Sequence, residues 1–96
     1  MKYFHRTSVA PDAVVDRAAA YFGARMQATE EGARRRAFTS PLGTVRVAVQ
    51  AEGGHYTLVT VETDQPGESE LDRVAKRFLS VVHTMAEPGH ALRGAY

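Results

Sequence analysis

The stretch Glu68–Ala86, ESELDRVAKRFLSVVHTMA, constrains the fold of this chain more than any other. Its apolar residues recur at spacings of three and four, which is typical of an amphipathic helix with one buried stripe. The stripe consists of Leu71, Val74, Ala75, Phe78, Val82 and Met85. The opposite arc is charged and includes Asp72 and Lys76 as an i,i+4 pair. Such a helix would span roughly 28 Å, so the rest of the chain must build the surface that covers the stripe.

Length and composition limit what that surface can enclose. The chain has 96 residues, which predicts a single domain over 1–96 with one core and little room for a large internal cavity. No apolar run is long enough to span a membrane, and the N-terminal residues lack the apolar region of a signal peptide, so we expect a cytoplasmic protein without a membrane partner. The chain has no cysteine, which excludes disulfides and thiolate chemistry.

The elements before this helix are predicted from changes in period and from turn residues. Lys2–Val9 alternates like a strand, and Pro11 begins a helix that runs to Phe22. From Arg25 onward the period becomes two, with turn residues every eight to twelve positions, which indicates an antiparallel meander. Its four strands are expected at Arg25–Glu30, Ala33–Ser40, Thr44–Glu52 and His55–Thr63. The predicted fold is therefore α+β, an antiparallel sheet in the order β-α-β-β-β-β-α packed on a long C-terminal helix, with a loosely ordered tail over 88–96.

Hairpin geometry turns this order into an assignment of sheet faces. A two-residue loop at Gly53–Gly54 sets Glu52 opposite His55, and a bulge at Gly43 sets Ser40 opposite Thr44. The face expected under the long helix then collects Met26, Ala28, Arg35, Ala37, Val45, Val47, Val49, Tyr56 and Leu58. The outer face collects an apolar patch of Phe38, Ala48, Val59 and Val61, which is typical of an interaction surface. If Gly43 does not bulge, the strand 33–40 turns over, and Phe38 and Arg35 exchange faces.

The order of elements resembles the polyketide-cyclase/START-type helix-grip superfamily, also called SRPBCC-like. The resemblance rests on the opening YFHRTSVAPDAVVDRAAAYF and the closing GGHYTLVTVETDQPGESELDRVAKRFLSVV. It implies a curved sheet that grips the C-terminal helix around a hydrophobic pocket. The chain is shorter than a usual member and lacks at least one strand and the second short helix. The topology is also similar to one repeat of the TATA-box-binding-protein fold, although no DNA-contacting motif can be matched.

Polar residues indicate no catalytic or metal site. The four histidines form neither an HExxH motif nor an i,i+4 pair, so we expect no metal and no cofactor. The run Arg34–Arg36 could contact nucleic acid, but a net charge of +1 makes such a partner a weaker interpretation than a solvated strand. Arg35 could anchor a ligand carboxylate under the helix or form an internal pair with Glu30.

Three functions stay open at this point. The first is a non-catalytic protein that binds a small apolar or amphipathic ligand between the sheet and the C-terminal helix, contacted by Tyr3, Arg35, Tyr56, Phe78 and His83. The second is a homodimeric interaction module that uses Phe38, Ala48, Val59 and Val61. The third is a small cyclase-like enzyme in the same pocket. No residue is predicted to be catalytic, and the sequence favours a binding protein over an enzyme.

Overall fold

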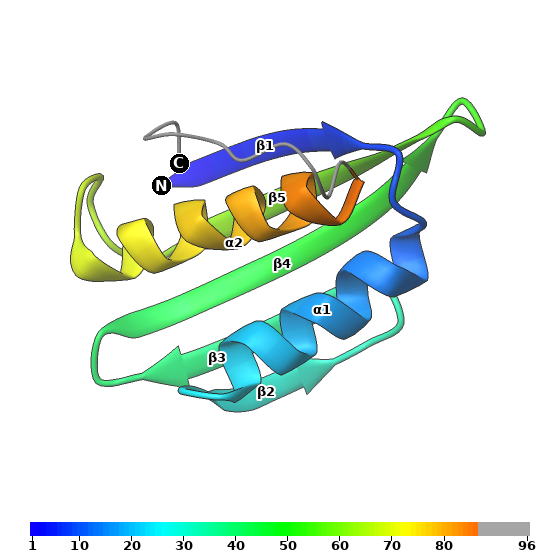
Figure 1. The fold of residues 1–96 in the computed structure, drawn as a ribbon. Helices are drawn as coiled ribbons and strands as arrows, with labels where there is room; N and C mark the ends of the chain where they lie inside the picture. The colour runs from blue at the N-terminus through cyan, green and yellow to red at the C-terminus, as the bar shows by residue number, and fades with distance from the viewer. Residues whose placement is uncertain (87–96) are drawn as a thin grey trace.

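The structure is a computed structural model that describes residues 1–86. It contains the predicted order of elements, β-α-β-β-β-β-α, which confirms the α+β fold (Figure 1). The elements are β1 (Lys2–Thr7), α1 (Pro11–Gly23), β2 (Gln27–Glu31), β3 (Arg35–Ser40), β4 (Gly43–Glu52), β5 (Tyr56–Thr63) and α2 (Glu70–Ala86). The tail over 88–96, for which we expected loose order, lies outside the described residues. Neither of the helices within residues 1–86 is long and apolar enough to cross a membrane.

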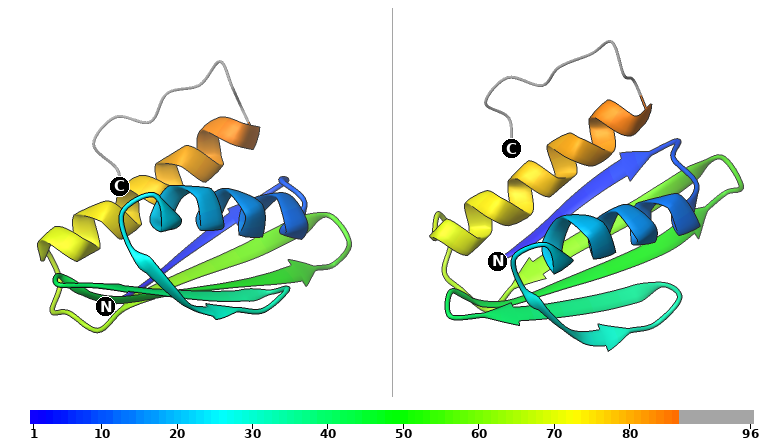
Figure 2. Two further views of the ribbon diagram at one scale, coloured as in Figure 1. Left: turned by 90° about the horizontal axis from the view of Figure 1, so that it is seen from below. Right: turned by 60° about the horizontal axis from the view of Figure 1, so that its bottom comes forward.

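The five strands form one antiparallel sheet in the order β1-β5-β4-β3-β2. The first strand therefore pairs with the last one in the chain, and the meander fills the rest of the sheet. Both helices lie on the same face, α2 over β1 and β5 and α1 over β3 and β4 (Figures 1 and 2). The opposite face, which we call the open face, is covered by no element of the described part of the chain (Figure 2).

The core lies between the helices and the sheet. Side chains of α1 and α2 meet the helix-facing side chains of β3, β4 and β5 there, and the fully buried ones include Val14, Ala18, Phe22, Phe38, Val45, Val59, Val61, Leu71, Ala75, Phe78, Leu79 and Val82. The stripe predicted for the C-terminal helix is thus the buried side of α2, with Val74 and Met85 half-buried at its margins. The prediction that Asp72 lies on the solvent arc is wrong, because this residue is 0% exposed.

The β4–β5 hairpin has a different register from the predicted one. Glu52 lies opposite Tyr56 rather than His55, so the loop contains three residues, Gly53, Gly54 and His55. The two glycines have φ of 60° and 75°, a left-handed backbone that favours glycine. One additional loop residue turns every side chain of β5 to the other face of the sheet.

The β3–β4 hairpin also differs from the expectation, since Gly43 does not bulge. Ser40 lies opposite Gly43, and Pro41 and Leu42 form a two-residue loop. Phe38 therefore lies opposite Val45 on the helix-facing side, while Arg35 lies opposite Ala48 on the open face. Since the predicted registers of β3 and β5 were both wrong by one residue, the residues assigned to the two faces of these strands are exchanged.

Candidate functional site

Phe78, expected to contact a ligand, lies in the centre of the core. Its side chain is 0% exposed, and its ring centroid lies 5.1 Å from that of Phe22 and 5.5 Å from that of Tyr21. Phe22 in turn stacks on Phe38, with 5.4 Å between the ring centroids. Protein interiors are close-packed, so this aromatic cluster fills the space in which the sequence predicted a ligand.

Arg35 and Tyr56, the other expected ligand contacts on the strands, lie on the open face. Tyr56 is 58% exposed, and Arg35 is exposed opposite Ala48. Both assignments to the helix-facing side were wrong because of the one-residue registers described above. Of the five predicted contacts, only Tyr3, Phe78 and His83 share the space between the sheet and α2, and none of the three lines any of the pockets described below for residues 1–86.

Tyr3 belongs to a buried polar cluster around Asp72. Asp72 Oδ1 accepts hydrogen bonds from Tyr3 Oη at 3.0 Å and Thr63 Oγ1 at 2.8 Å, and Asp72 Oδ2 accepts one from Ser69 Oγ at 2.7 Å. Ser69 Oγ also accepts the Asp72 backbone N–H at 3.0 Å, as an N-cap serine does at the start of a helix. The Ser-x-x-Asp spacing is close to a capping box, so the sequence does carry a signal for this contact. Lys76 lies over the ring of Tyr3, 5.3 Å from its centroid, instead of pairing with Asp72.

The pKa and the hydrogen bonds of Asp72 suit a structural role rather than a catalytic one. Burial raises the pKa of Asp72, but hydrogen bonds from Ser69, Thr63 and Tyr3 lower it by more, so the net pKa lies below the ordinary value. Asp72 is thus a buried carboxylate, ionised at neutral pH, whose two oxygens already accept three hydroxyl groups. Its hydrogen bonds connect the first turn of α2 to Tyr3 of β1 and Thr63 of β5. Because Asp72 is 0% exposed, a substrate cannot reach its carboxylate.

His83, the remaining predicted contact, lies beside His5. Their ring centroids are 6.0 Å apart with an interplanar angle of 69°, so β1 and the C-terminal half of α2 meet through two imidazoles. Burial lowers the pKa of His5, and the nearby charge of His83 lowers it further. This pair favours the neutral form of His5 at neutral pH.

The arginine run alternates as predicted, but with the faces exchanged. Arg34 binds Asp12 of α1, and Arg36 Nη1 lies 3.7 Å from Glu31 Oε1. These two arginines therefore extend to the helix-covered side. Arg35 extends to the open face near Arg46, which lies one strand away.

A small apolar pocket opens where α2 begins, next to the β3–β4 turn. Its volume is about 240 Å³, and we call it the rim pocket. The lining is mostly apolar and consists of Arg25, Met26, Ser40, Pro41, Leu42, Leu71 and Val74. Arg25 is the only charged residue among them, and its guanidinium lies 5.4 Å from the ring centroid of Tyr21. The sequence did not predict this site because the lining comes from three separated segments.

The apolar patch predicted for the outer face is mostly wrong. Phe38, Val59 and Val61 are fully buried under the helices, and only Ala48 lies on the open face. The open face instead presents different apolar side chains, which alternate with the buried ones on β1 and β5: Phe4, Tyr56 and Leu58. Phe4 is 57% exposed.

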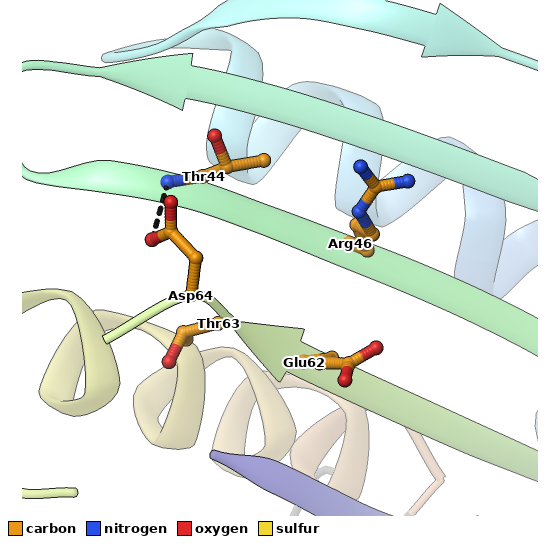
Figure 3. A pocket seen from close by; sticks show the side chains of 5 residues that line it. All are labelled: Thr44, Arg46, Glu62, Thr63 and Asp64. Atoms are coloured by element: carbon orange, nitrogen blue, oxygen red, sulfur yellow. Dashed lines mark hydrogen bonds between the residues drawn. The ribbon is translucent and has the colours of Figure 1, made fainter. Parts of the chain in front are cut away.

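Charged residues surround a shallow groove on the open face. The groove has a volume of about 280 Å³, with Ala48 and Thr60 at its centre and Lys2, Glu30, Arg35, Arg46 and Glu62 among its lining residues. It continues at Arg46 and Glu62 into a second hollow of about 240 Å³, where Asp64 accepts a hydrogen bond from the Thr44 backbone N–H at 2.9 Å (Figure 3). Arg46 and Glu62 lie directly opposite each other on β4 and β5. The groove forms because the small side chains of Ala48 and Thr60 lie among longer charged side chains.

Metal-binding side chains do not gather in the described part of the chain. Among residues 1–86 there is no group of three or more His, Asp or Glu side chains placed to hold a metal ion.

Comparisons with known proteins give a likeness of fold. No family model matches the chain, and no curated protein matches it. A solved structure of a conserved protein of unknown function from Enterococcus faecalis is similar, with a TM-score of 0.63 and 11% sequence identity. The likeness covers 99% of this chain and 75% of that one. At this identity it concerns the fold alone, so membership of the helix-grip superfamily stays a prediction.

Proposed function

We propose that the protein is a non-catalytic binding protein for a small amphipathic acid, which places its apolar part in the rim pocket. The observation that carries the proposal is an apolar pocket with a single cation at its edge, between α2 and the end of the sheet. A few polar groups that converge on an apolar concave surface are characteristic of small-molecule sites. The proposal keeps the ligand class predicted from the sequence and moves its site from beneath α2 to the end of the helix.

The shape of the core favours the rim over the interior. The ring of Phe22 lies under the helices with its centroid 5.4 Å from that of Phe38 and 5.1 Å from that of Phe78, so an interior ligand would have to displace these rings. At the rim, Leu71 and Val74 of α2 meet Leu42 of the turn without closing the surface. Leu42 is 42% exposed, so a ligand reaches this pocket without unfolding any element.

The polar side of the pocket suits a carboxylate. Arg25 forms no ion pair among the described residues, and its position beside the Tyr21 ring limits its freedom before a ligand binds. Guanidinium groups bind carboxylates through two parallel hydrogen bonds. Ser40 Oγ accepts the Leu42 backbone N–H at 3.1 Å, so its own hydroxyl proton can be donated to a ligand.

The size of the pocket limits the ligand. A volume of about 240 Å³ is below the roughly 300 to 1,000 Å³ of sites for drug-sized molecules. A short-chain or single-ring carboxylic acid therefore suits the pocket better than a lipid or a polyketide. Binding is favoured over catalysis because Asp72, the most buried carboxylate of residues 1–86, is enclosed by hydroxyl groups, and Arg25 is the only ionisable residue in the described lining of the pocket.

A titration followed by ¹H–¹⁵N correlation spectra tests the proposal. Hexanoate should shift the amides of Met26, Leu42, Leu71 and Val74, and hexanol, which has no carboxylate, should bind more weakly. Arg25→Gln removes a charged hydrogen bond of about 1.5 to 3 kcal/mol and should raise the Kd for hexanoate by roughly 10- to 100-fold. Arg35→Gln, a matched exposed arginine on the open face, should leave the Kd unchanged. Amide shifts that are confined to residues outside the rim pocket would refute the site. An Arg25→Gln variant that binds hexanoate as tightly as the native chain would also refute it.

A further inference from the structure

We propose that two copies of this chain pair through their open faces. The two-fold axis of this dimer lies between the two stacked sheets, over the line between β4 and β5, and runs parallel to these strands. This inference does not depend on the rim pocket, which lies at the end of α2 away from the open face. It rests on two observations, an exposed apolar patch and a pattern of charges that is complementary to itself.

The apolar patch is the first observation. Phe4 and Tyr56 are 57% and 58% exposed, and Leu58 and Ala48 lie on the same face with partial exposure. Ala48 and Thr60 occupy the centre and are small, so two sheets can approach there to the roughly 10 Å separation of packed sheets. The groove of about 280 Å³ is the space that side chains of a second copy would fill. Exposed aromatic side chains on a bare sheet face are typical of interaction sites.

The charge pattern is the second observation. Arg46 and Glu62 lie directly opposite each other across β4 and β5, and neither forms an ion pair among residues 1–86. A two-fold axis between these strands exchanges the two positions, so Arg46 meets Glu62 of the partner subunit, and Glu62 meets Arg46 of the partner subunit. An interface of this kind is self-complementary, as two-fold symmetry requires.

The same axis also brings together two other residues of the open face. Phe4, Thr60, Ala48 and Arg35 form one row across the strands β1, β5, β4 and β3. The axis therefore sets Phe4 against Arg35 of the partner subunit, a pair suited to a cation–π contact. Arg35 forms no ion pair among the described residues and is available for this contact.

A second copy fits this face better than nucleic acid does. Glu30, Glu62 and Asp64 border the grooves together with Arg35 and Arg46. These carboxylates would repel a polyanion, whereas interspersed charges of both signs suit a protein surface with the same pattern.

Sedimentation velocity over a range of concentrations tests the pairing. We expect a reversible dimer for the native chain. Arg46→Glu and Glu62→Arg each place like charges across the interface and should weaken the dimer by about a hundredfold, whereas Leu42→Asp, outside the open face, should not weaken it. An equimolar mixture of Arg46→Glu and Glu62→Arg should dimerise again, because each chain then meets opposite charges on the other.

A double variant guards against loss of folding in the single ones. Arg46→Glu with Glu62→Arg keeps opposite charges across β4 and β5 within the chain, so it should fold, form its own dimer and fail to pair with the native chain. A native chain that remains monomeric at all concentrations would overturn the proposal. A dimer insensitive to Arg46→Glu would also overturn it, as would single variants that do not pair on mixing. Retention of nucleic acid by the native chain in place of a dimer would do the same.

Discussion

Tyr3 Oη donates a hydrogen bond to Asp72 Oδ1 at 3.0 Å, which joins the first strand of the sheet to the first turn of the last helix across 69 positions of the chain. Thr63 on β5 donates to the same oxygen at 2.8 Å. The carboxylate thus fixes where α2 begins over the sheet. Its position also determines which residues of α2 reach the core and which border the rim pocket.

Removal of this carboxylate should destabilise the fold strongly. Asp72→Ala leaves the hydroxyls of Thr63, Ser69 and Tyr3 without their acceptor, and each unsatisfied buried group costs about 1 to 3 kcal/mol. We expect the free energy of unfolding in urea to fall by about 3 kcal/mol or more, and by about 1 kcal/mol for Tyr3→Phe. Asp16→Ala, at an exposed position of α1, is the control and should have little effect. Equal losses for Asp72→Ala and Asp16→Ala would contradict the anchoring role.

Two phenylalanines test the assignment of the sheet faces. Phe78→Ala removes a ring that is 0% exposed and should lower the free energy of unfolding by roughly 3 to 5 kcal/mol. Phe4→Ala removes a ring that is 57% exposed and should change the stability of the monomer by no more than about 0.5 kcal/mol. Both measurements require protein dilute enough to be monomeric. A large loss for Phe4→Ala under these conditions would place that ring in the core.

Gly43 at the start of β4 should not tolerate a side chain. Its φ is 131°, and a Cβ atom there would lie 2.5 Å from Asp64 Oδ1 and 2.7 Å from Gln65 Nε2. Gly43→Ala should therefore cost roughly 1 to 3 kcal/mol from backbone strain alone and disrupt the Asp64 hydrogen bond to Thr44. Gly23→Ala is the matched control, because nothing lies within 4 Å of its Cβ position and it ends a helix. Thermal unfolding of the two variants should differ clearly, and similar midpoints would refute the requirement for a positive φ at Gly43.

Stability should depend on pH in two separate ranges. The pKa of His5 is lowered from 6.5 by burial and by His83, so the folded protein binds fewer protons at this site than the unfolded chain does. The contribution of neutral His5 to the stability of the fold should be fully present above pH 6.5. It should be lost as the pH decreases from there towards the lowered pKa. The pKa of Asp72 lies below 3.8, because its hydrogen bonds outweigh burial, so a second loss should occur as the pH falls below that value.

Urea unfolding of three proteins across about pH 3 to 8 would separate these ranges. His5→Gln should flatten the upper part of the profile and leave the acidic part intact. Asp72→Asn should make the acidic part less steep and leave the upper part intact. Some slope should remain, because hydrogen bonds from Gln65 and from the Thr44 backbone also lower the pKa of Asp64. A native profile that is level between about pH 5 and 6.5 would contradict the role of His5.

The sequence determined the order and type of the elements. The apolar residues from Leu71 to Val82 recur at spacings of three and four, which match the period of a helix and not that of a strand. Turns rich in glycine and proline separate the strands from one another. These are local properties, because each depends on residues that are neighbours along the chain. For the same reason the Ser69-x-x-Asp72 cap could have been predicted, although its contacts with Tyr3 and Thr63 could not.

Only the tertiary structure decided which face of the sheet each strand residue occupies. Both faces of β5 carry apolar side chains, such as Leu58 on one and Val59 on the other, so the pattern fits either register. On β5 a single loop residue, His55, selects between them. On β3 the two-residue loop of Pro41 and Leu42 decides separately whether Phe38 or Arg35 faces the helices. The rim pocket and the Asp72 cluster likewise depend on segments that meet only after folding. Local periodicity therefore determined the elements, and long-range packing determined the surfaces on which function depends.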